Sequence, residues 1–69
     1  MIEVFSTNVQ ESPEADKLVG LLRRHFPNSR INFDLDDCDK ILRVEGADFH
    51  PFAVIGLVKA NGFDCKILE

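Results

Sequence analysis

The order in which apolar residues change their spacing constrains this chain more than any other feature. Apolar and polar residues alternate, as in β-strands, over 2–5, 30–36, 41–45 and 63–68. Over 13–26 and 51–60, apolar residues instead recur every three or four positions, as on one face of a helix. Pro13, Pro27 and Pro51 stand at junctions between these segments, where proline begins or ends an element. The spacing therefore predicts the order βαββαβ.

Local signals refine the two helices and the first strand. Ser12 is placed to cap the first helix, because a serine hydroxyl can accept a hydrogen bond from the first helical turn. Asn61 and Gly62 are placed to end the second helix. In the first strand, we expect Ile2 and Val4 to point inward.

Each predicted strand has one apolar face, and two helices can cover these faces from the same side of an antiparallel sheet. Right-handed crossovers place the first and third strands in the centre, with the order 4-1-3-2. We therefore expect an α+β fold, the ferredoxin-like βαββαβ sandwich, with a four-stranded antiparallel sheet and two helices on one face. At 69 residues, the chain forms a single domain over 1–69.

Composition narrows the class of partner. The chain is 45% hydrophobic and 29% charged, as in ordinary globular domains. Eight basic and 12 acidic residues give a formal net charge of −4, which opposes attraction to nucleic acid or to anionic lipid. Neither an apolar run of about 18 residues nor a secretory leader is visible. We expect no nucleic-acid or membrane partner and a cytoplasmic location.

Residue types that carry chemistry are few and scattered. Cys38 and Cys65 are too far apart for a CxxC motif, so we expect two ordinary thiols without a disulfide between them. His25 and His50 fall near helix ends, without another histidine or cysteine at ligand spacing. Ser6, Thr7 and Ser12 lack an adjacent base in the sequence. We expect no catalytic, cofactor-binding or metal-binding residue, no cofactor and no enzymatic activity.

One acidic stretch approaches the spacing of a calcium-binding loop. Its residues match loop positions 1, 3, 5, 8 and 12 and are Asp34, Asp36, Cys38, Ile41 and Glu45. Asp39 stands where such a loop needs glycine, and a strand pattern precedes the stretch where a helix would be required. The sequence predicts a solvated hairpin, with weak binding of a hard cation as the alternative.

Three segments carry a resemblance to a known family. They are Ile2-Glu3-Val4, Ile41-Leu42-Arg43-Val44 and the ending LVKANGFDC at 57–65. Over about its full length, the chain resembles the heavy-metal-associated (HMA) family of copper chaperones and of metal-binding repeats in copper-transporting ATPases. That family holds Cu(I) with a GMxCxxC motif between the first strand and the first helix, but 6–13 contain neither cysteine nor methionine. The resemblance implies a divergent member that lacks the thiolate site.

These observations favour a small non-enzymatic HMA-like module for binding or interaction. Its expected partner is another protein or a second copy of the chain, bound at the open sheet face or at the edge strands. The expected interaction surface comprises Phe5, Ile41, Arg43 and Leu68. One alternative is a protein for heavy-metal transport or sensing that uses ligands other than CxxC. A second is an ACT-like regulatory domain that binds small molecules in pockets at a dimer interface.

Overall fold

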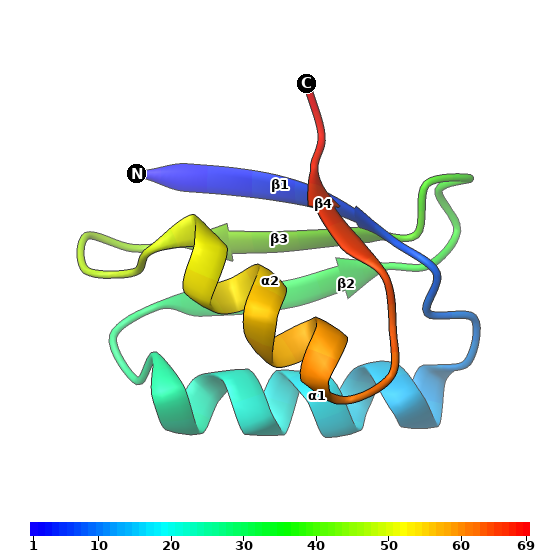
Figure 1. The fold of residues 1–69 in the computed structure, drawn as a ribbon, viewed down its shortest axis with the longest axis horizontal. Coiled ribbons are helices and arrows are strands. Elements are labelled where there is room, and N and C mark those ends of the chain that lie inside the picture. Colours follow the sequence, from blue (N-terminus) through cyan, green and yellow to red (C-terminus); the bar gives the residue numbers. More distant parts are fainter.

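The computed structural model describes residues 1–69 as an α+β domain with one four-stranded antiparallel sheet and two helices (Figure 1). In chain order the elements are β1 (Ile2–Thr7), α1 (Ser12–His25), β2 (Arg30–Asp34), β3 (Ile41–Glu45), α2 (Pro51–Ala60) and β4 (Cys65–Ile67). The element order predicted from apolar spacing is confirmed. No helix has the length and the apolar composition needed to cross a membrane.

The strands lie in the order β2-β3-β1-β4. Counted from the β4 edge, the same order is β4-β1-β3-β2, so β1 and β3 occupy the centre and β2 and β4 form the edges. Every neighbouring pair is antiparallel. Both edges therefore belong to short strands, of five residues in β2 and three in β4.

The core lies between one face of the sheet and both helices (Figure 1). A single buried cluster joins strand residues to helix residues, and its fully buried members are Phe5, Leu22, Leu42, Val44, Val54 and Val58. Since this cluster includes residues of α1 and of α2, both helices cover the same face. A smaller cluster of Val9, Ala15 and Leu18 closes the end near the start of α1.

The expected inward pair of β1 is wrong. Phe5 is fully buried, whereas Ile2 remains 55% exposed. The register places Phe5 between Leu42 of β3 and Ile67 of β4 on the helix side. Because successive strand residues point to opposite faces, Ile2 and Val4 then point away from the helices. The phenyl ring buries more apolar area than either alternative, so it sets the phase of the strand.

The helix ends follow the sequence signals in part. Ser12 is the first residue of α1, and the preceding cap position, Glu11, makes no side-chain hydrogen bond, so the predicted Ser12 cap is wrong. His50 caps α2, because its Nδ1 accepts a hydrogen bond from the backbone N–H of Phe52 at 3.2 Å. Beyond α2, Gly62 adopts a φ of 92°, a conformation that glycine tolerates and that ends the helix as predicted.

Candidate functional site

The loop between β1 and α1 is held by hydrogen bonds at its start. Thr7 Oγ1 donates to the backbone oxygen of Lys40 at 2.6 Å, and the Asp64 backbone N–H donates to Asn8 Oδ1 at 2.8 Å. Directly after Thr7 and Asn8, Val9 is fully buried. The loop therefore closes one end of the core, and it contains neither cysteine nor methionine.

The two cysteines are free, which confirms the expectation of unlinked thiols. Cys65 faces the core, and burial raises the pKa of its thiol from 9.0 to about 11, although the nearby charge of Lys59 opposes this shift. At neutral pH, the Cys65 thiol therefore keeps its proton and is a poor nucleophile or metal ligand. Cys38 is exposed in the turn between β2 and β3.

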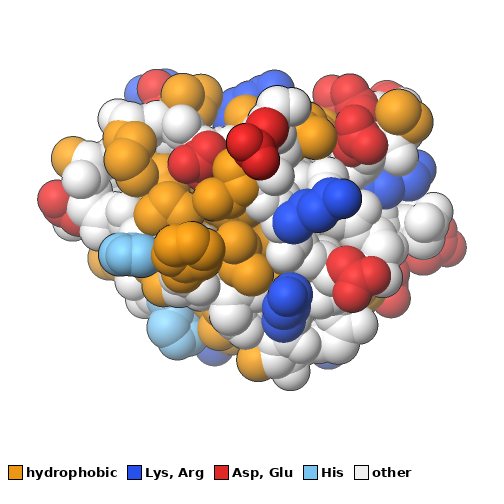
Figure 2. Space-filling model, turned by 45° about the horizontal axis from the view of Figure 1, so that its top comes forward, with side chains coloured by type: hydrophobic (Ala, Val, Ile, Leu, Met, Phe, Trp, Pro, Cys, Tyr) orange, Lys and Arg blue, Asp and Glu red, His pale blue; other side chains and the backbone are white.

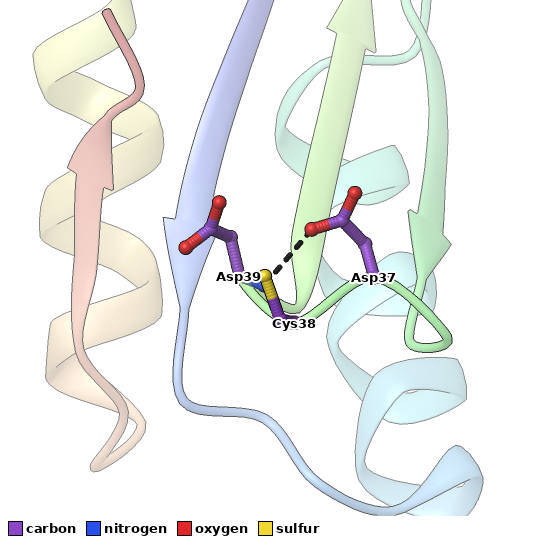
Figure 3. Close-up of side chains that lie close together, drawn as sticks. All are labelled: Asp37, Cys38 and Asp39. Carbon is purple, nitrogen blue, oxygen red and sulfur yellow. Dashed lines mark hydrogen bonds between the residues drawn. The ribbon is translucent and has the colours of Figure 1, made fainter.

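The turn before β3 brings three potential metal ligands together (Figure 3). Donor atoms of Asp37, Cys38 and Asp39 lie within 4.8 Å of one another, and all three residues are exposed. The backbone N–H of Asp39 donates to Asp37 Oδ1 at 2.9 Å, a bond that forms the turn itself. Local turn geometry thus accounts for this grouping.

The calcium-like spacing does not form a loop in the fold. Asp34 and Glu45 lie at opposite ends of the β2–β3 pair, because Asp34 pairs with Ile41 and Glu45 pairs with Arg30. The prediction of a hairpin over this segment is confirmed.

Both histidines make local contacts. His50 caps α2, and the Nδ1 atom of His25 lies 3.1 Å from the backbone oxygen of Leu21, one turn earlier in α1. They lie near the end of α1 and the start of α2, as the sequence predicts.

The four residues predicted to form an interaction surface have different environments. Phe5 is fully buried in the core, and Ile41 is only 5% exposed, so neither can contact a partner. The prediction that Phe5 and Ile41 belong to an interaction surface is therefore wrong. For Phe5 the reason is the phase of β1, which turns its ring toward the helices. Arg43 is exposed on β3, and Leu68 is exposed immediately after β4.

Large apolar side chains are exposed at four positions, and the predicted interaction surface contains only one of them, Leu68. They are Met1, Ile2, Phe52 and Leu68, and we call this set the apolar surface. Figure 2 shows hydrophobic side chains gathered on one side of the molecule, next to histidine. Phe52 is the most exposed, at 69%, and its ring centroid lies 5.7 Å from that of His50. Phe52 follows Pro51 at the start of α2, where most residues are apolar, so the sequence alone did not distinguish it from residues that face the core.

The edge strand β2 has one polar, exposed face and one apolar face that is buried or half-buried. Arg30, Asn32 and Asp34 are exposed, whereas Ile31 is buried and Phe33 is half-buried. Figure 1 shows β2 at the side of the sheet that lies next to α1. Side chains of alternating chemistry therefore border an edge that no other strand covers.

The hydrogen-bond phase of the sheet fixes which backbone groups of β2 are unpaired. In antiparallel sheets, successive residues direct their N–H and C=O groups to opposite neighbours. The N–H of Gly46 donates to the backbone oxygen of Met1 at 2.9 Å, so even-numbered residues at this end of β3 bond β1. Odd-numbered residues of β3 therefore bond Arg30, Asn32 and Asp34. The N–H and C=O groups of Ile31 and Phe33 point outward from the sheet.

Two adjoining depressions border this edge, and together with it they form what we call the β2 edge groove. One end is lined by Arg23, Arg30 and Arg43, together with Glu45. The other end is lined by Asp16, Asp34 and Asp36, with the apolar side chains of Ala15, Val19 and Phe33 between α1 and β2. The groove thus has a predominantly basic end, an apolar wall and an acidic end.

No protein-family model, curated protein or solved structure matches this chain. The β2 edge groove combines an uncovered strand edge with charged side chains of both signs.

Proposed function

We propose that this chain is a non-enzymatic protein-interaction module with a ferredoxin-like fold, and that it binds an extended segment by strand addition at the β2 edge groove. The outward-pointing backbone groups of Ile31 and Phe33 carry this proposal. In strand addition, main-chain hydrogen bonds supply affinity, while alternating side chains select the partner. The basic and acidic ends of the groove would set the orientation of the bound segment.

The HMA resemblance is compatible with this proposal if the chain is a distant relative of that family. A relative that kept the fold and lost its metal-binding loop would retain the sheet edges as its remaining binding surfaces. In this chain, the buried Val9 and the hydrogen-bonded Asn8 give the loop between β1 and α1 a structural role.

Metal binding is the second candidate, because the donor atoms of Asp37, Cys38 and Asp39 lie close together. Calorimetric titration with Zn²⁺ distinguishes it from the first. An interaction module should give no stoichiometric binding. One-to-one binding that Cys38→Ser abolishes, with Cys65→Ala as the matched control, would favour the metal-binding candidate.

A short peptide tests strand addition. Bound antiparallel to β2, a peptide places its N-terminal part beside Asp34 and its C-terminal part beside Arg30. We therefore expect the peptide Lys-Val-Thr-Val-Glu, with both ends blocked, to shift the amide resonances of Ile31 and Phe33. The charge-reversed peptide Glu-Val-Thr-Val-Lys should bind more weakly. The proposal fails if neither peptide perturbs these two amides.

A further inference from the structure

We propose that the occupant of the β2 edge groove is a second copy of this chain, paired antiparallel with the first about a twofold axis that passes between the two Asn32 residues. This inference rests on the proposed function, because it names the partner of the same edge. It would join two four-stranded sheets into one continuous eight-stranded sheet.

The sequence of β2, RINFD, is self-complementary in charge. Position 30 carries a base and position 34 an acid, and both lie two residues from Asn32. Antiparallel pairing about Asn32 therefore places Arg30 opposite the partner's Asp34, and Asp34 opposite the partner's Arg30. Cross-strand pairs of opposite charge stabilise a sheet, whereas like charges directly opposite destabilise it.

The backbone phase agrees with this register. Because Ile31 and Phe33 point their backbone groups outward, Ile31 and the partner's Phe33 form a hydrogen-bonded pair. The symmetric pair is equivalent. The two Arg–Asp pairs then occupy non-hydrogen-bonded positions, where opposing side chains approach more closely.

Helix α1, which lies beside β2, also carries an acidic residue at one end of the groove and a basic residue at the other. Asp16 lines the acidic end of the groove, and Arg23 lines the basic end. The twofold axis that exchanges the ends of β2 brings Arg23 toward the partner's Asp16.

Overall charge does not favour self-association, because the chain carries a formal charge of −4. The groove itself carries both signs, and they are separated along its length. Attraction is therefore confined to one register and one direction, and screening by salt should weaken it.

Charge exchange tests this register. The molar mass of the wild-type chain is followed by sedimentation equilibrium from about 10 μM to about 1 mM, a range suited to weak association. We expect a monomer–dimer equilibrium. Arg30→Asp places a carboxylate opposite the partner's Asp34, and Asp34→Arg places a guanidinium opposite the partner's Arg30. Each variant should weaken dimerisation about tenfold or more.

Mixing the two variants restores opposite charges at both pairs, because one copy then carries two acids and the other two bases. We expect the equimolar mixture to form a heterodimer, and the double variant R30D/D34R to form a homodimer again. Arg24→Asp makes the same charge change on α1 outside the groove lining and should dimerise as the wild type does. Recovery in the mixture also shows that the single variants are folded.

Three results would overturn the inference: a wild-type chain that stays monomeric throughout, dimerisation that R30D leaves unchanged, or a mixture that stays monomeric. If the wild type is monomeric but the blocked peptide still shifts the Ile31 and Phe33 amides, strand addition stands and the second copy is wrong as its partner. If the peptide also fails to bind, both proposals fail.

Discussion

At the level of single residues, Phe5 and Ile2 occupy opposite environments within the same strand. Phe5→Ala removes a fully buried ring and leaves a cavity, so we expect a loss of about 3 to 5 kcal/mol in the free energy of unfolding. Ile2→Ala should change that free energy by no more than about 0.5 kcal/mol, because its side chain is largely exposed. Urea denaturation of both variants measures this. Similar losses for the two would contradict the observed phase of β1.

Cys65 gives the stability of the domain a defined dependence on pH. Its folded-state pKa of about 11 lies above the 9.0 of a free thiol, so the unfolded chain loses this proton first as pH rises. The free energy of unfolding should therefore fall between about pH 9 and about pH 11, by up to about 3 kcal/mol. Denaturation at several pH values measures this fall.

Cys65→Ala is the control for this dependence. The variant should lack the part of the fall that comes from the thiol, whatever its stability at neutral pH. Parallel profiles of stability against pH for the wild type and the variant would show that burial does not raise this pKa.

Residue environments were harder to predict from sequence than elements were. Both faces of β1 carry apolar residues, so alternation alone could not decide whether Ile2 and Val4 or Phe5 face the core. Val9 gave no periodic signal either, because it packs from a loop. Only the strand register, which depends on contacts distant in sequence, resolves such cases.

At the level of elements, β2 should show alternating hydrogen exchange. Asn32 donates its N–H within the β2–β3 ladder, whereas the N–H groups of Ile31 and Phe33 point outward. In the R30D variant at low concentration, we expect the amide of Asn32 to exchange at least about 100-fold more slowly than those two, since its bond opens only with the ladder. NMR-detected exchange provides the measurement. Equal protection of all three amides would contradict the assigned phase.

The elements themselves were predictable because each has a clean apolar period between turn residues. The boundaries shifted where tertiary contacts intervened: β2 ends at Asp34, and Leu35 joins the second core cluster from the turn that follows. The charge symmetry of RINFD was also present in the sequence. This symmetry indicates a pairing surface only once β2 is known to be an edge strand and the backbone groups of Ile31 and Phe33 are known to point outward.

At the level of the whole molecule, the two accessible surfaces involve different edges of the sheet. The β2 edge groove lies along one edge, and Leu68 of the apolar surface follows β4 at the other. Pairing through β2 would leave Phe52 uncovered. We therefore expect Phe52→Ser to change the dimer dissociation constant by less than about twofold, as sedimentation equilibrium can determine. A large change would place the dimer contact on α2 instead.

Contacts between the two copies provide the most direct test of the central claim, that the free edge of β2 pairs with β2 of a second copy. A mixture of isotope-labelled and unlabelled chains allows NMR to detect only those proton pairs that join two molecules. The account predicts intermolecular contacts between the Hα protons of the two Asn32 residues, and between those of Arg30 and the partner's Asp34. Intermolecular contacts confined to α2 or β4, or none at millimolar concentration, would contradict it.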